Sequence, residues 1–203
     1  MNGIDHIVVS ANSLAEGVAH VEAALGVTLA GGGKHALMST HNRLLGLGDL
    51  YLEVIAIDPE APPPGRPRWF DLDHFAGPPR LTNWVAQAQD LPATLALCPP
   101  GLGKPVEMTR GAYRWDYTVP ADGRLPFDGA FPALLHWHGR RPPDDLPDCG
   151  LRLTRFDLIH PQADALRTAL GAIIDDDRIT VTQGPAKALR ATFDGPSGPR
   201  VLA

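Results

Sequence analysis

The chain has 203 residues, of which 44% are hydrophobic and 20% charged, and its formal net charge is -5. The length suits one large domain or two small ones, and the composition excludes a disordered chain and a coiled coil. The negative charge provides no basic surface for nucleic acid, and no apolar run reaches the ~18 residues that a membrane-spanning helix needs. We therefore expect a cytoplasmic protein that has neither nucleic acid nor a membrane as a partner.

Two residue types constrain the connections and cross-links. Cys98 and Cys149 are the only cysteines, and their spacing indicates neither a disulfide framework nor a zinc knuckle. The 21 glycines and 21 prolines exceed the usual share of each residue, so many connections should be stiff or tightly turned.

The first 58 residues predict a strand, a helix and three further strands, in the order βαβββ. Residues 4–10 alternate as a strand does, and Ser13 is a suitable N-cap for a helix that ends at Gly26. Turn residues then divide three strands, predicted at 31–39, 41–48 and 51–58.

The same plan returns after residues 59–80, whose seven prolines predict a long connection. Asn83 stands eight residues before Leu91, just as His6 stands eight before Leu14, and further strands are predicted at 104–111, 113–121 and 132–139. A second proline-rich segment, 140–150, precedes a third strand, turn and helix followed by three short strands. We therefore predict three modules, at 1–58, 81–139 and 151–203.

The repeat determines the predicted fold. A βαβββ unit leaves one sheet face that it cannot cover alone, so it has to pair with a copy of itself. We expect a single domain over 1–203, of the α+β class, in which mixed curved sheets form a cup. The module outside the cup should extend the sheet or pair with a second subunit, which favours a homodimer.

Two stretches carry a resemblance to a known family. "IDHIVVSANSLAEGVAHVEAALGV", residues 4–27, resembles the first strand and helix of the vicinal oxygen chelate superfamily, and "LYLEVIAID" resembles its fourth strand. The likeness is to its glyoxalase-like proteins, of the glyoxalase, bleomycin resistance and dioxygenase type. It implies a glyoxalase-like fold in which His6 and Glu53 are metal ligands, with lyase, isomerase or dioxygenase chemistry on a substrate with vicinal oxygens.

The residues themselves also suggest convergence of these two side chains. Alternate residues of a strand share a face, so His6 shares one with Ser10, and Glu53 shares one with Tyr51. If the strands are neighbours, His6 and Glu53 can hold a divalent Zn, Fe, Mn or Ni ion. Without a metal, they can form a hydrogen-bonded pair that lines a pocket.

The other modules depart from the usual two-histidine, two-glutamate ligand set. Alignment of the modules puts Asn83 at the position of His6 and His136 at that of Glu53, while Arg155 and Leu202 take these places in the third module. Arginine is not a normal metal ligand. A metal site of His6, Glu53 and His136 remains one interpretation, with His138 in place of His136 if the alignment slips by two residues. The others are a metal-free pocket that uses these polar groups and structural roles alone.

Four further residues are candidates for substrate binding. Trp84, Trp137 and His138 could form an aromatic wall with a polar group, and Arg43 could hold a carboxylate. The alternatives are core packing for the tryptophans and solvent exposure for Arg43. Two functions are therefore possible. The first is an enzyme that acts on a small oxygen-bearing metabolite and uses Glu53 as metal ligand or proton acceptor. The second is a non-catalytic binding protein without metal, like the antibiotic-sequestering members of the superfamily.

Overall fold

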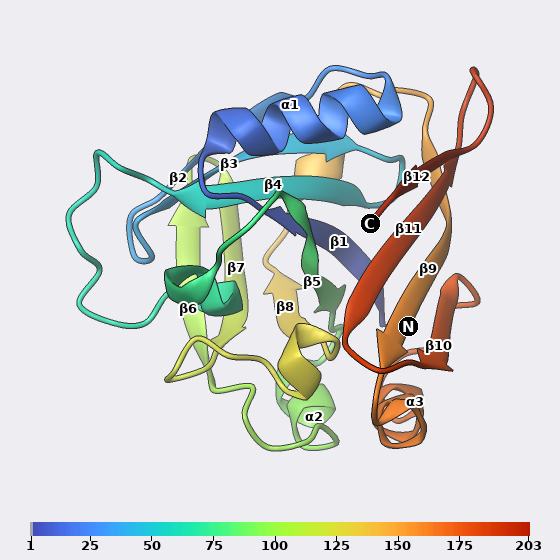
Figure 1. Cartoon of the computed structure of the whole chain (residues 1–203). Helices are drawn as coiled ribbons and strands as arrows, with labels where there is room; N and C mark the ends of the chain where they lie inside the picture. Colours follow the sequence, from blue (N-terminus) through green and yellow to red (C-terminus); the bar gives the residue numbers. More distant parts are fainter. Residues whose placement is uncertain (1) are drawn as a thin grey trace.

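A computed structural model describes residues 2–203 as two β-sheets with helices packed against them (Figure 1). The α-helices are α1 (Leu14–Leu25), α2 (Leu91–Leu95) and α3 (Ala163–Gly171), and the short 3-10 helices are η1 (Trp69–His74), η2 (Phe127–Gly129) and η3 (Pro142–Asp144). The strands are β1 (Gly3–Ser10), β2 (Ala30–His35), β3 (Thr40–Gly46), β4 (Tyr51–Ile57), β5 (Arg80–Gln87), β6 (Lys104–Arg110), β7 (Tyr113–Val119), β8 (Ala133–Trp137), β9 (Arg152–His160), β10 (Ile179–Gln183), β11 (Ala188–Asp194) and β12 (Arg200–Leu202). The predicted order of elements is found in all three modules.

The first two modules share one curled sheet of eight strands, in the order β2-β3-β4-β1-β5-β8-β7-β6. Within each module the first and last strands are parallel neighbours, β1 with β4 and β5 with β8. The modules join where β1 pairs antiparallel with β5. This sheet is the predicted cup, and it confirms the α+β class.

The third module forms a separate sheet of four strands, in the order β10-β9-β11-β12. Its elements follow the βαβββ order along the chain, but its first strand, β9, lies between β10 and β11 instead of beside the last strand. The third unit is therefore not a structural copy of the other two, because the same element order is compatible with more than one strand order.

The third sheet packs on the outer side of the cup, away from its concave face. Phe156 and Phe193 of this sheet are fully buried in one apolar cluster with Ile7 and Trp84 of the central strands. The apolar face of the third module is thus covered within the chain. The homodimer was expected because the third module needed a partner to cover this face. The packing within the chain removes that reason.

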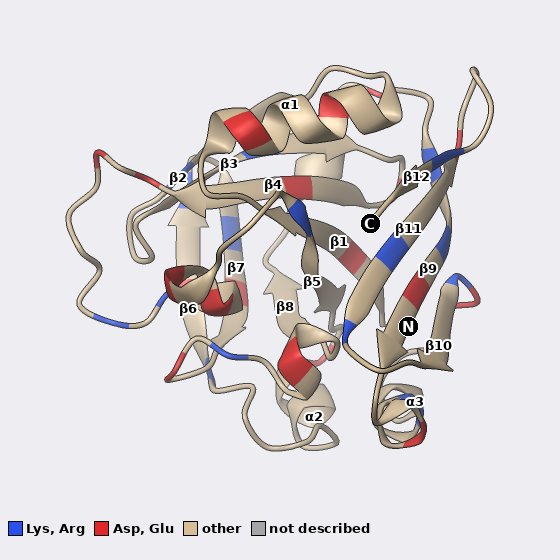
Figure 2. Ribbon diagram, viewed as in Figure 1, with Lys and Arg blue, Asp and Glu red and all other residues tan. Residues whose placement is uncertain are grey.

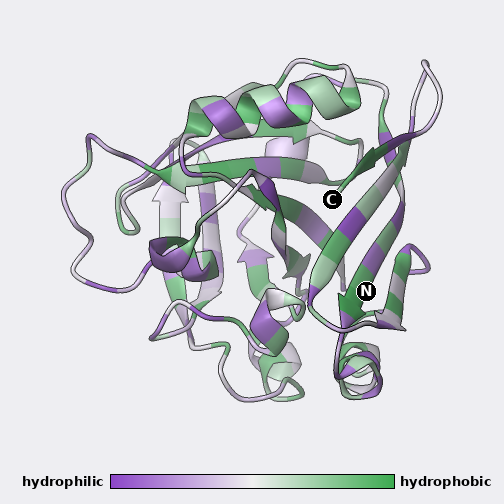
Figure 3. Ribbon diagram, viewed as in Figure 1, coloured by the Kyte–Doolittle hydropathy of each residue, from purple (hydrophilic) through white to green (hydrophobic). Residues whose placement is uncertain are grey.

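The helix α1 forms where the sequence predicts it. The Ser13 side chain accepts a hydrogen bond from the backbone N–H of Glu16, and Gly26 ends the helix with a left-handed φ of 71°. At Gly17 a Cβ would lie 2.5 Å from Cγ1 of Val54, so the glycine allows the helix to lie close on β4. Figure 3 shows the mixture of apolar and polar positions along this helix.

The proline-rich connection between the first two modules reaches the concave face of the cup. Its short helix η1 buries Trp69 and Phe70 in the apolar cluster on the concave face of the sheet.

Elsewhere, Cys98 and Cys149 are free thiols. None of the helices in residues 2–203 has the length and apolar character required to cross a membrane.

Candidate functional site

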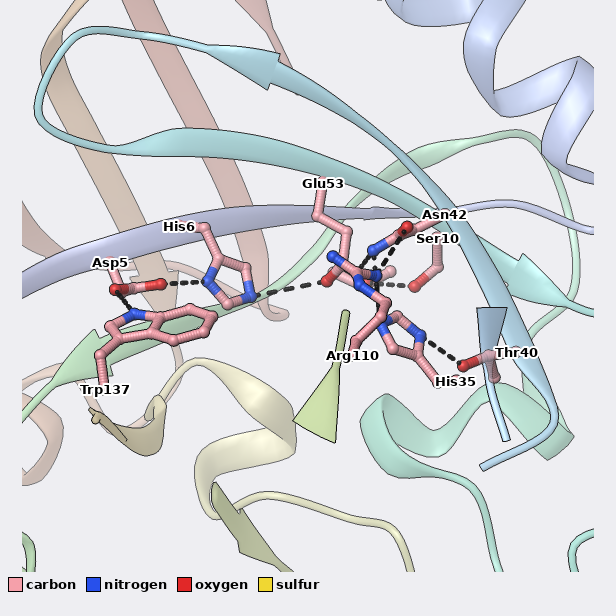
Figure 4. Close-up of polar contacts among 10 residues, drawn as sticks. Asp5, His6, Ser10, His35, Thr40, Asn42, Glu53, Arg110 and Trp137 are labelled. Carbon is pink, nitrogen blue, oxygen red and sulfur yellow. Dashed lines mark hydrogen bonds and ion pairs between the residues drawn. The ribbon is translucent and has the colours of Figure 1, made fainter. Parts of the chain in front are cut away.

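The concave face of the cup carries a buried row of three ionisable side chains from β1 and β4 (Figure 4). His6 Nδ1 lies 2.7 Å from Oδ1 of Asp5, and His6 Nε2 lies 3.5 Å from Oε2 of Glu53. An irregularity in the pairing of β1 with β5 between Ile4 and His6 lets the adjacent Asp5 and His6 interact. The imidazole is thus held between two carboxylates. Glu53 also accepts a hydrogen bond of 2.5 Å from the Asn42 amide.

These contacts fix the charge of the row. Burial alone would lower the pKa of His6, but the hydrogen bonds and charges of Asp5 and Glu53 outweigh it and raise this pKa to about 9. Burial would raise the pKa of Glu53, yet its hydrogen bond with His6 and the positive charge of that ring lower it to about 2. At neutral pH the site therefore holds an imidazolium and a carboxylate.

Arg110 brings a second cation to the same site from the opposite edge of the sheet. The curl of the sheet brings the edge strands β2 and β6 together, and Nη1 of Arg110 lies 3.0 Å from Nε2 of His35 and 3.3 Å from Oδ1 of Asn42. A guanidinium donor requires an unprotonated Nε2, and burial lowers the pKa of His35 to about 4. Gly33 leaves room for the arginine stem, since a Cβ there would lie 3.2 Å from Arg110 Cδ.

Aromatic side chains surround these charges. Tyr51 stacks on His6 with ring centroids 4.5 Å apart, and Trp137 donates a hydrogen bond of 2.8 Å from Nε1 to Oδ2 of Asp5. Two further polar groups, the Tyr117 hydroxyl and the Trp69 indole N–H, are buried without a hydrogen-bond partner among residues 2–203. They are donors that a ligand in the cup could satisfy.

The cup is closed in this conformation. Its cavity has a volume of about 30 Å³, far below the ~300–1,000 Å³ of ordinary small-molecule sites. Trp69 and Phe70 of η1 take up the remaining space, and Phe70 and Asp71 have left-handed φ values of 59° and 53°. Such backbone strain costs about 1–3 kcal/mol at each residue, so this closed segment is held by its packing.

The side chains present do not fit the three-ligand metal site expected from the sequence. His136 lies on the other face of β8 from the cup residues Leu135 and Trp137, and its Nδ1 contacts the backbone oxygen of Ala88. No cluster of three or more His, Cys, Asp or Glu side chains in the described part of the chain is arranged to hold a metal ion. The Arg110 guanidinium donates to Nε2 of His35, so this imidazole nitrogen is not free to bind a metal ion. The positive charge of Arg110 would also repel a metal ion.

Strand register explains why His136 is out of reach. In the first module Val8 pairs with Glu53, and in the second module the corresponding Val85 pairs with Ala133. Ala133, and not His136, therefore takes the place of Glu53 in the second module. The alignment of the modules in the sequence analysis had matched residue types, and it placed the last strand of the second module three positions out of register.

The remaining predicted residues are dispersed. Trp137 lines the cup as expected, whereas Trp84 faces the third sheet, where its ring meets the edge of Phe156. The exposed His138 pairs with Asp116 outside the cup. Arg43 lines a larger cavity of about 840 Å³ beside the first turn of α1. We take the cup as the candidate site because the strongly shifted ionisable groups gather there and not in the larger cavity.

The sequence left several cup residues unnoticed: Asp5, His35, Asn42, Trp69, Arg110, Trp115 and Tyr117. Asp5 and Asn42 could have been suspected, as they lie on the same strands as His6 and Arg43. Trp69 and Arg110 carry no such signal, because they reach the cup through a connection and through the curl of the sheet.

Comparison with known proteins agrees with this fold. A curled sheet built from two βαβββ modules, with buried polar side chains on its concave face, defines a glyoxalase-like protein. The chain matches the family model of the glyoxalase-like domain over residues 4–174, and so it belongs to that family, which confirms the resemblance to the vicinal oxygen chelate superfamily. No curated protein matches the chain.

Three of the similar solved structures illustrate the likeness, and the first of them shows the fold at low sequence identity. A hypothetical protein from Staphylococcus aureus has a TM-score of 0.63 at 10% identity, over 92% of this chain and 88% of the other. Methylmalonyl-CoA epimerase from Streptomyces coelicolor, in complex with 2-nitronate-propionyl-CoA, has a TM-score of 0.43 at 15% identity, over 66% of this chain and 94% of the other. The epimerase from Mycobacterium tuberculosis has a TM-score of 0.42 at 14% identity, over 68% and 89%.

Proposed function

We propose that the protein binds a small, oxygen-bearing, anionic metabolite in the cup without a metal ion. The observation that carries this proposal is the state of Arg110, whose guanidinium has only neutral partners, His35 and Asn42, among the described residues. A partly buried cation without a carboxylate partner favours an anionic ligand, and Arg110 can bind two oxygens of one carboxylate or phosphate.

The neighbouring groups suit the rest of such a ligand. Both ring nitrogens of His6 are directed at carboxylates, those of Asp5 and Glu53, and Asp5 also lies 3.5 Å from Nη2 of Arg141. The unpartnered donors of Tyr117 and Trp69 can bind carbonyl or hydroxyl oxygens. Entry requires η1 to move, because the present cavity holds no more than one or two molecules of the size of water.

Ligand binding can be tested with matched variants of two arginines in the second module. We would screen small carboxylates and sugar phosphates by thermal shift, and measure the affinity of each hit for the wild type, Arg110→Gln and Arg114→Gln. Arg114 is exposed and paired with Glu107, so its variant makes the same charge change outside the cup. A loss of about tenfold or more for Arg110→Gln alone supports the proposal, and equal affinities contradict it.

The metal hypothesis is tested by elemental analysis of the protein purified without a histidine tag, beside His6→Ala. One equivalent of Zn, Fe, Mn or Ni in the wild type, lost in the variant, would contradict a metal-free cup. It would then support the lyase, isomerase or dioxygenase chemistry that the family resemblance suggested.

A catalytic role for Glu53 is the second candidate. Its carboxylate contacts the His6 imidazolium, so a proton could pass between substrate, Glu53 and His6. The low pKa of Glu53, about 2, makes it a weak base, and for this reason we favour binding over catalysis. Glu53→Gln separates the two, because an enzyme would lose turnover whereas a binding cup would keep most of its ligand affinity.

A further inference from the structure

A second polar pocket lies beside the cup, between η1, η2, β5 and the third sheet. Its volume is about 340 Å³, within the range of small-molecule sites. Phe70 separates it from the cup, since this side chain lines both cavities. We call it the outer pocket and define it by Arg80, Asn83, Arg124 and Lys187. Figure 2 shows charged residues of both signs on the segments around it.

Its cations are only partly neutralised. Arg124 contacts Asp71, with Nε 3.2 Å from Oδ1, and His74 contacts the same oxygen at 2.7 Å. The other carboxylate, Asp128, is largely exposed and lies 3.7 Å from Nε2 of His160. Neither carboxylate is within ion-pair distance of the two remaining cations of the pocket.

These two cations are Arg80 and Lys187. Nη1 of Arg80 donates to the backbone oxygens of Ala76 and Pro78, and the Lys187 ammonium donates to the backbone oxygen of Thr82. Neither has a salt bridge with a carboxylate in residues 2–203. Each keeps unused donors, because a guanidinium has five N–H groups and an ammonium has three.

Burial opposes the positive charge of Lys187. Burial lowers its pKa to about 8, with Arg80 lowering it further and Asp128 partly opposing the shift. An anion placed between the two side chains would restore a favourable environment for both.

Asn83 adds a neutral polar side chain to the lining of the same pocket. It is only 4% exposed and lines the outer pocket. Gly129 leaves room for this side chain, since a Cβ there would lie 2.3 Å from Nδ2 of Asn83. An amide in this lining can donate to an oxygen atom of a bound group.

We infer that the outer pocket binds an anionic oxygen group, a phosphate or a carboxylate, through Arg80, Asn83 and Lys187. The site is distinct from the cup and does not depend on the function proposed for it. Arginine offers paired donors to such a group, lysine offers a positive charge, and the asparagine amide adds a fixed donor.

The test measures binding of inorganic phosphate and of malonate, by ³¹P NMR for the first and calorimetry for both. We expect at least one to bind at millimolar concentration and to lose about 10- to 100-fold in affinity in Lys187→Gln and in Arg80→Gln, as expected for lost hydrogen bonds to a charged group. Binding of phosphate alone identifies a phosphoryl ligand, and binding of malonate alone identifies a carboxylate. Binding of neither probe overturns the inference.

Three variants distinguish a built site from general attraction of anions. Arg190→Gln removes one positive charge from an exposed position on β11, and it should leave the affinity unchanged. Asn83→Ala keeps the charge and should weaken binding, and it also serves if a cationic variant does not fold. The titrations are repeated in an Arg110→Gln background, which removes the anion site proposed for the cup, so that the binding that remains belongs to the outer pocket. Equal losses in the variants of Arg190 and Lys187, or none for Asn83→Ala, would refute the inference.

Discussion

The charge of His6 gives the folded state a pH dependence of defined sign. Burial opposes its protonation, but Asp5 and Glu53 together raise its pKa to about 9, from 6.5 in an unfolded chain. Between these two values the folded protein binds more protons than the unfolded one. The contribution to stability is therefore complete below pH 6.5 and is lost as the pH rises through about 9.

The size of the effect follows from the shift. At about 1.4 kcal/mol for each pKa unit, the whole contribution of His6 is about 3 kcal/mol. Lys187 limits the useful range, because burial lowers its pKa from 10.5 to about 8 and its linkage raises stability above that pH. His35, whose pKa burial lowers to about 4, acts mainly below pH 6.5. Between pH 7 and 8 the free energy of unfolding should thus fall by about 1 kcal/mol.

Urea unfolding followed by tryptophan fluorescence measures this slope. His6→Gln should remove it, whereas His138→Gln should keep it, because His138 is exposed and pairs only with Asp116. An NMR titration of the His6 ring gives the pKa directly, even if His6→Gln does not fold. A stability that is flat or rises between pH 7 and 8, with His6 titrating near its ordinary value, would refute the ion-paired arrangement.

Three other predictions concern the closed cup and the assembly. Trp69→Ala should destabilise the fold by about 3–5 kcal/mol in urea and admit benzene to the cup by NMR, and unchanged stability would show that η1 does not pack as described. Gly123→Ala should expose residues 59–80 to proteolysis, because Gly123 has a φ of 77° and a Cβ there would lie 2.0 Å from the backbone oxygen of Arg68; identical cleavage of variant and wild type would contradict this anchor. Sedimentation at micromolar concentration tests the homodimer expected from the sequence, and a single monomeric species would exclude it.

Local signals were sufficient to predict the order of the α-helices and strands, although not the short helices η1, η2 and η3. The Ser13 cap, the left-handed Gly26 and the alternation in β1 are properties of neighbouring residues, so they can be read without the fold. The order of strands in the third sheet could not be read in this way. It depends on how that sheet packs against Ile7 and Trp84, which are more than 60 residues distant from it in sequence.

The candidate site also contains residues whose position the sequence predicts and residues whose position it does not. The convergence of His6 and Glu53 follows from strand periodicity and from the pairing of β1 with β4, which the resemblance to the family implied. The position of Arg110 does not, because only the curl of the eight-stranded sheet brings β6 to β2. Trp84 shows the limit of composition, because an aromatic residue on a central strand can face either side. Here Trp84 faces the third sheet, whereas Asn83 lines the outer pocket and Val85 packs in the apolar cluster on the concave face.

The duplication supports the proposal that the cup binds an anion and not a metal. The family resemblance implies that both modules contribute ligands at matched positions, and in this chain those positions hold His6 and Glu53 in one module but Asn83 and Ala133 in the other. An amide is a weaker ligand than an imidazole, and alanine has no donor atom. The second module instead contributes Arg110, whose positive charge opposes a metal ion but attracts an anionic ligand. Two modules with the same backbone have thus diverged into a carboxylate-rich half and a cationic, aromatic half, and the ligand has to match both.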